Sequence, residues 1–235
     1  MVQTMKKLLT ALTFSLAATV WAGDFEAGVA AYERRDFKMA FTFFQKAADQ
    51  GDVVAQYNIA TMYELGEGVS RNTVEANRIF KIAAERGNMF AQFHLALNYR
   101  LGVGGARDRV EAARLLKLAA AQGHPRSQFY TAEGHYFGDD GLLQSYVEAV
   151  RWYKLAAVQG DSQAQGKLAR MYQKGEGVLQ DFLLGHMWAN LAFAAGNEAA
   201  RETRIIVARE MSPQQVAKAQ AMAKRCLASN YKDCN

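Results

Sequence analysis

Proline is scarce in this chain, which argues against several domains joined by linkers. Only 2 of the 235 residues are proline. Linkers between domains are usually rich in proline, glycine or serine, and no such stretch divides the sequence. The abundant Ala, Leu, Gln, Arg and Lys residues favour helices over strands. We therefore expect one continuous, all-helical unit.

The chain also lacks a hydrophobic run long enough to cross a membrane comfortably, which takes about 20 residues. The apolar run Leu8–Val20 follows Lys6 and Lys7 and ends in small residues. This order is typical of a cleaved signal peptide. We predict a signal peptide over residues 1–22, a mature chain starting near Gly23, and export to the periplasm or beyond. An uncleaved anchor is the alternative.

Dense clusters of one charge are missing as well. The net charge is +5, and it falls to +3 once the two lysines of the predicted signal peptide are removed. Met5 directly precedes those lysines and is a second candidate start. The remaining basic residues are scattered, as on solvated helix faces, so we expect neither nucleic-acid binding nor membrane insertion after cleavage.

Cysteine occurs at only two positions, Cys226 and Cys234, both in the last ten residues. In an oxidising compartment, two cysteines eight residues apart most simply form one local disulfide. Two free thiols are the alternative. A metal site would need further ligands, and Asp233 is the only plausible one nearby. We expect no metal and no cofactor.

Glycine, in contrast, recurs with a regular period. Ala-rich runs end at glycines spaced 36, 36, 37 and 36 residues apart, at Gly51, Gly87, Gly123, Gly160 and Gly196. Further glycines break each copy and predict turns at Gly66–Gly68, Gly102–Gly105, Gly138–Gly141 and Gly175–Gly177. A period of this length indicates stacked repeats, each built from one helix pair. One pair cannot bury its apolar face alone, so the copies must stack.

The segment AQYNIATMYELGEGVSRNTVEANRIFKIAAERG, residues 55–87, resembles a Sel-one-like repeat, the longer cousin of the tetratricopeptide repeat. The resemblance implies an all-α, right-handed α/α solenoid of stacked antiparallel helix pairs. Its expected parts are a tetratricopeptide-like unit at 23–51, Sel-like repeats at 52–87, 88–123, 124–160 and 161–196, and C-terminal capping helices with the disulfide at 197–235.

In such solenoids the first helix of each pair lines the concave face. The resemblance therefore predicts a partner-binding groove formed by Tyr57, Thr61, Glu64, Phe93, Leu97, Arg100, Arg126, Phe129, Glu133, Tyr136, Arg170 and Gln173. Three of these residues, Tyr57, Phe93 and Phe129, would form an aromatic ladder for a peptide. The alternative is that these aromatic residues only pack within the fold.

No nucleophile elbow (G-x-S-x-G) and no zinc-protease motif (H-E-x-x-H) occurs in the sequence. His94 and His135 are interpreted as structural, His124 as a helix cap and His186 as exposed. The resemblance implies a non-enzymatic adaptor that binds envelope proteins or peptides. Two alternatives are a protein that binds or hydrolyses cell-wall fragments or β-lactams, and a structural subunit of an envelope machine.

Overall fold

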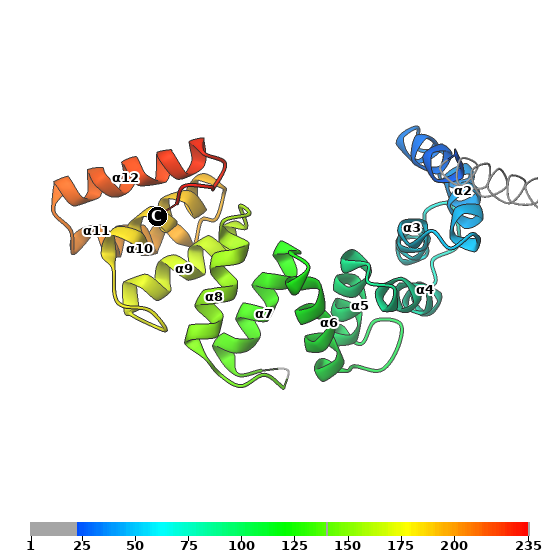
Figure 1. Cartoon of the computed structure of the whole chain (residues 1–235), viewed down its shortest axis with the longest axis horizontal. Coiled ribbons are helices and arrows are strands. Elements are labelled where there is room, and N and C mark those ends of the chain that lie inside the picture. The colour runs from blue at the N-terminus through cyan, green and yellow to red at the C-terminus, as the bar shows by residue number, and fades with distance from the viewer. Residues whose placement is uncertain (1–22, 140, 235) are drawn as a thin grey trace, which may run out of the picture. The chain divides into compact units, whose positions relative to one another are not determined.

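The computed structural model describes residues 23–139 and 141–234, and the regular elements among them are all helices (Figure 1). Helical residues 23–33 come first. They are followed by α2 (Phe37–Asp49), α3 (Val53–Leu65), α4 (Thr73–Glu85), α5 (Met89–Leu101), α6 (Arg109–Ala121), α7 (Pro125–Phe137), α8 (Tyr146–Ala157), α9 (Ser162–Lys174), α10 (Phe182–Ala194), α11 (Ala200–Arg209) and α12 (Pro213–Ala228). The all-α prediction is confirmed. The predicted signal peptide lies outside the described residues.

The chain divides into two compact units instead of the one continuous unit expected from the sequence. Unit 1 comprises Met1–Asp108 and unit 2 comprises Arg109–Asn235. Within unit 1, α2 packs on α3, α3 on α4 and α4 on α5. Within unit 2 the same succession runs from α6 to α10, and both α11 and α12 then pack on α10. Each unit is therefore a stack of helices in chain order.

Side-chain caps fix where most helices begin. The four helices that open the predicted repeats start after a residue whose side chain accepts a backbone N–H, at Asp52, Asn88, His124 and Asp161. The same four helices end at left-handed glycines, namely Gly66, Gly102, Gly138 and Gly175. A glycine adopts this conformation without the steric cost of a Cβ atom. The predicted turns are therefore confirmed.

Large residues fill the space between helix pairs. The side chains of Ile79, Leu115, Trp152 and Trp188 are all buried. Gly185 stands where the other copies have alanine, and a Cβ atom there would lie 3.3 Å from the carbonyl oxygen of Ala169 on α9. The departure from alanine thus accompanies a close approach of α10 to α9.

The C-terminal cap forms as predicted but with a different apolar stripe. Ser212 caps α12 in a reciprocal capping box with Gln215, which satisfies two helix-end donors. The buried positions of α12 are Ala219, Ala223 and Cys226. From the sequence we expect a stripe of Ala217, Ala219, Ala221 and Met222. Of these, Ala219 is buried and Met222 is half-buried, whereas Ala217 and Ala221 are exposed. Residues four and three apart share a helix face, whereas residues two apart do not.

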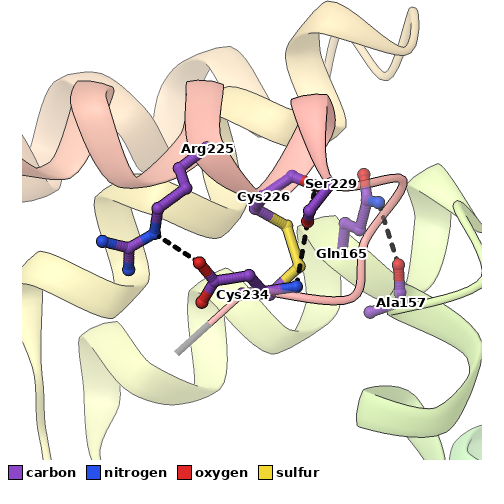
Figure 2. The surroundings of a disulfide bond; sticks show 7 residues. Ala157, Gln165, Arg225, Cys226, Ser229 and Cys234 are labelled. Carbon is purple, nitrogen blue, oxygen red and sulfur yellow. Dashed lines mark hydrogen bonds and ion pairs between the residues drawn. A yellow bond between two sulfur atoms is a disulfide. The ribbon is translucent and has the colours of Figure 1, made fainter.

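The two cysteines are joined in a disulfide that folds the tail back onto the end of α12 (Figure 2). The Ser229 hydroxyl donates to the carbonyl oxygen of Cys226 (2.8 Å) and accepts from the amide of Asp233 (2.9 Å). Both sulfur-bearing residues are buried in the core of unit 2. The ring of Tyr231 lies over the turn at Gly160, so the tail also contacts the preceding repeat.

Candidate binding groove

Apart from Arg126, the predicted groove residues occupy three fixed positions, six, ten and thirteen residues after each repeat glycine. Gly160, for example, is followed by Gly166, Arg170 and Gln173 at these positions. Counting in the same way from Gly196 gives three more residues, Glu202, Ile206 and Arg209, which all lie on α11. Sequence reasoning missed them because it took α11 only as part of the cap.

Several of these positions meet in one groove of unit 2, with a volume of about 580 Å³. Its lining comes from α7, α9 and α11 with the turn before it, namely Phe129, Gln163, Gly166, Lys167, Arg170, Gln173, Lys174, Asn197, Ala199, Ala200, Glu202, Thr203 and Ile206. A smaller hollow of about 140 Å³, lined in part by Tyr136, shares Lys167 and Arg170 with it. The helix α11 therefore continues the series of groove-lining helices.

Two of the four charged residues in the lining of this groove are already paired within unit 2. Lys167 forms an ion pair with Glu133 (2.8 Å), whose carboxylate also accepts a hydrogen bond from the Tyr153 hydroxyl. Lys174 pairs with Glu176 (3.3 Å). Arg170 is exposed and forms no ion pair with any carboxylate in the described part of the chain. Its guanidinium is thus available to a ligand.

Glu176 also accepts a hydrogen bond from the Tyr136 hydroxyl (3.0 Å). Burial is the main cause that raises the pKa of Tyr136, and the bond to Glu176 raises it further. Burial likewise raises the pKa of Tyr153, with the Glu133 hydrogen bond as the second cause. Both phenols stay protonated at neutral pH and act as hydrogen-bond donors that fix the two carboxylates.

Two predicted binding residues are engaged in packing instead of projecting into the groove. Phe129 is only 6% exposed and its ring lies 5.9 Å from that of Tyr153. Arg126 pairs with Asp161 (3.3 Å) and its guanidinium lies over the Phe129 ring. Phe129 is therefore a largely buried part of the groove wall, as in the alternative that these aromatic residues pack within the fold.

In unit 1 the predicted residues gather around His94, a residue outside the predicted set. The Tyr57 hydroxyl lies 3.3 Å from His94 Nε2, and Glu64 Oε2 lies 3.4 Å from His94 Nδ1. Glu64 also accepts a hydrogen bond from Asn98 (2.9 Å). The His94 hydrogen bond is the largest cause that lowers the pKa of the Glu64 carboxyl. Two polar partners thus satisfy His94, as expected of a structural histidine.

The other unit 1 candidates are partly buried. The Thr61 hydroxyl donates to the carbonyl oxygen of Tyr57 (3.0 Å) and lines a hollow of about 290 Å³ beside Tyr32. Phe93, Leu97 and Arg100 are all of intermediate exposure. The predicted aromatic ladder is divided between the units, because Tyr57 and Phe93 belong to unit 1 and Phe129 to unit 2.

The remaining histidines take structural positions. His124 caps α7 through Nδ1, as predicted. His186 is 2% exposed, which corrects the expectation that it is exposed. Burial lowers the pKa of its imidazole, and the Asn190 amide lies 2.9 Å from its Nδ1. It lies on α10, one of the most deeply buried helices of unit 2, so its helix face does not reach solvent.

The described residues bear on two further kinds of site, a metal centre and a serine–lysine pair. No group of three or more His, Cys, Asp or Glu residues suited to a metal ion occurs in residues 23–139 and 141–234. One Ser-x-x-Lys spacing, Ser229 to Lys232, occurs in the tail. There the Ser229 hydroxyl donates to a backbone carbonyl and accepts a backbone amide, which holds it as a turn residue and not as a nucleophile.

Stacked helix pairs joined by paired-glycine loops define this chain as an α-helical repeat protein. The Sel1 repeat model matches residues 25–52, 53–88, 90–124, 125–161 and 162–197, so the chain belongs to the Sel1 repeat family. The match includes the first unit, which the sequence pattern likened to a tetratricopeptide repeat. Sel1 repeat proteins generally act as protein–protein interaction scaffolds.

A solved structure agrees with this assignment. A Sel1 repeat protein from Oxalobacter formigenes is 26% identical, with a TM-score of 0.73 over 90% of this chain and 86% of that one. The protective antigen c5321 of uropathogenic Escherichia coli, which displays an SLR fold, is 20% identical with a TM-score of 0.47, over 90% of this chain and 62% of that one. Curated protein sequences give no significant match. Among the described helices, none is long and apolar enough to span a membrane.

Proposed function

We propose that this chain is a scaffold that binds a peptide segment of a partner protein in the groove between α9 and α11. The observation that carries the proposal is the convergence of equivalent repeat positions on that groove, among them Arg170, Gln173, Glu202 and Ile206. A groove of several hundred cubic ångströms with mixed polar and apolar walls suits a peptide. The exposed Arg170 in the groove lining provides a charged contact that can orient a bound peptide.

We further propose that the scaffold works in the periplasm or outside the cell, where its partners are envelope proteins. Two observations support this compartment. The N-terminal residues have the order of a signal peptide, with charged residues first, then an apolar run and then small residues. The Cys226–Cys234 disulfide is of a kind that persists in oxidising compartments. Cell fractionation tests the assignment, because a chain found only in the cytoplasm at full length would contradict it.

Site-specific photocrosslinking in intact cells tests the binding groove. A photoreactive residue at Gln173 or Thr203 lies on the groove, whereas one at Lys117 on α6 is exposed elsewhere on the same unit. We expect both groove positions to give one shared, discrete adduct that the Lys117 position does not give. Equal adducts from all three positions, or none from the groove, would contradict the proposed function.

A further inference from the structure

The groove lies beside Gly166, at a position where the three preceding copies carry an aromatic ring. Tyr57, Phe93 and Phe129 occupy the position six residues after a repeat glycine, and Gly166 occupies it in the next copy. Gly166 lies in the lining of the groove of about 580 Å³, beside Phe129. The groove at this point is therefore bounded by the Gly166 backbone, the Phe129 ring and the Asn197 amide, which stands where a side chain at Gly166 would begin.

This hollow is fixed by its surroundings. A Cβ atom at Gly166 would come within 2.8 Å of the Asn197 amide nitrogen, which itself donates to the carbonyl oxygen of Ser162 (2.8 Å). The Asn197 side chain is thus tied to the start of α9 and forms one edge of the space. On the α11 wall, Ile206 is 37% exposed and offers apolar surface. An apolar side chain from outside would find partners on both walls.

A charge lies one helical turn away on the same helix face. Arg170 follows Gly166 by four residues on α9, which places the two about 6 Å apart along the axis. Lys167 and Lys174, the other cations in the lining, already have carboxylate partners. Glu202 is the single carboxylate of the lining and forms no ion pair among the described residues. Arg170 is thus the cation available for a ligand carboxylate.

We propose that the bound peptide supplies a bulky apolar side chain to the hollow over Gly166 and a carboxylate to Arg170. The inference rests on the proposed function, because it names the chemistry of that groove's ligand. In an extended peptide, residues two apart lie on one face, about 7 Å from each other. This distance matches the separation of Gly166 and Arg170 along α9. The ligand is therefore an extended segment with an aromatic residue and an acidic residue two positions apart.

Fluorescence anisotropy with labelled peptide pools of about twelve residues tests this directly on the mature chain. The first pool carries a fixed Phe with Glu two positions away in a background of small polar residues. In matched pools Phe becomes Ala, or Glu becomes Lys. We expect the Phe/Glu pool to bind best, with each replacement weakening binding by about fivefold or more. Equal dissociation constants for the three pools would overturn the inference.

Charge reversal in the protein supplies the second arm. Arg170→Glu is an exposed substitution, and we expect it to favour the Lys pool over the Glu pool. Glu202→Gln removes the lining carboxylate, so it should tighten binding of the Phe/Glu pool. Arg151 on α8 lies outside the groove, and its side chain is 61% exposed. Arg151→Glu should therefore leave the binding of all pools unchanged. Identical changes in Arg170→Glu and Arg151→Glu would overturn the role of Arg170.

The two proposals fail in different ways. If groove crosslinks form in cells but no pool is preferred, the groove binds its partner through other chemistry and this inference is wrong. If neither crosslinks nor pool binding occur, the proposed function itself is contradicted. Ile206→Trp provides an internal check, because it fills the hollow from the α11 wall and leaves Gly166 and Asn197 unchanged. It should abolish the Phe preference.

Discussion

Gly177 lies directly against the first residue of α8, such that a Cβ atom at Gly177 would come 2.3 Å from the carbonyl oxygen of Tyr146. Gly68 has the same relationship to Phe37 in unit 1. In both cases the second glycine of a loop contacts the start of a helix in the preceding copy. The recurring glycine pair therefore both ends a helix and lets adjacent repeats stack closely.

Gly177→Ala should destabilise unit 2 more than Gly141→Ala. Both glycines have positive φ, so both substitutions strain the backbone by about 1 kcal/mol or more. Only Gly177 faces backbone atoms, whereas the nearest atom to a Cβ at Gly141 is a Val110 methyl at 3.5 Å. Urea unfolding followed by the fluorescence of Trp152 and Trp188 measures the difference. Equal losses in the two variants would refute a packing role for Gly177.

Glu64→Gln should make unit 1 less sensitive to acid. The hydrogen bond with His94 lowers the pKa of Glu64 in the folded chain. The stability that the ionised Glu64 carboxylate contributes is therefore present above the ordinary carboxyl pKa of about 4.3. It is lost as the pH falls through the lower pKa that Glu64 has in the folded chain. At neutral pH the variant should be less stable, by on the order of 1 kcal/mol.

Urea unfolding followed by circular dichroism at pH 7 and near pH 3.5 compares Glu64→Gln with the wild type. The difference between the two proteins should shrink at the lower pH. Glu85→Gln, at an exposed position at the end of α4, provides the control and should behave as the wild type at both values. A difference for Glu64→Gln that is constant with pH would exclude the ionised carboxylate as its cause.

The period of the glycines was enough to predict the helix pairs, because left-handed turns and helix ends impose glycine locally. The division into two units at Asp108 could not be predicted in this way. The glycine spacing across Asp108 is the same as in the copy before it, so the period gives no sign of a boundary there. How closely successive copies pack depends on many residues together and cannot be inferred from any one position. The apolar stripe of α12 was partly misjudged because the alanines of that helix fall on two opposite faces, and only the face with Ala219 and Ala223 is buried.

Part of the lining of the proposed groove follows from the repeat register, but the contacts of its side chains do not. The three-position register located Arg170 and Gln173 on its lining, and it holds the information for Glu202 and Ile206 as well. The register does not show which side chains pair with one another inside the chain. Glu64 and Glu133 read as free surface charges in sequence, yet each has a polar partner on the neighbouring helix pair. Each such pair joins residues of two different copies. The repeat pattern assigns the same role to every copy, so it does not predict these pairs.

His186→Asn should flatten the pH dependence of unit 2 between about pH 7 and 5. Burial lowers the pKa of His186, so the unfolded chain binds a proton more readily than the folded one. The stability of the wild type is then greatest above the ordinary histidine pKa of about 6.5 and falls as the pH decreases below it. The urea midpoint reported by Trp188 fluorescence measures this slope, and parallel slopes for both proteins would contradict the assignment.

Loss of the disulfide should loosen the C-terminal cap without affecting unit 1. Closing a loop of this length stabilises the folded chain by about 2.5 kcal/mol at most in the chain-entropy account. Hydrogen exchange in the double variant Cys226→Ala, Cys234→Ala should rise in α12 and around Gly160, which Tyr231 covers. The amides of α3 and α4 should be unchanged. Two alkylatable thiols in unreduced exported protein would show that no disulfide forms in the cell.

The central claim is that a partner protein binds in the groove between α9 and α11. The most direct test combines a substitution that blocks this groove with a photocrosslinking residue that lines it. A photoreactive residue at Gln173 reports the partner, and Thr203→Trp fills the groove from the α11 wall. Lys117→Trp adds the same side chain at an exposed site on α6, as the matched control. We predict that the Gln173 adduct disappears in Thr203→Trp and persists in Lys117→Trp. An adduct that survives Thr203→Trp at full yield would contradict binding in this groove.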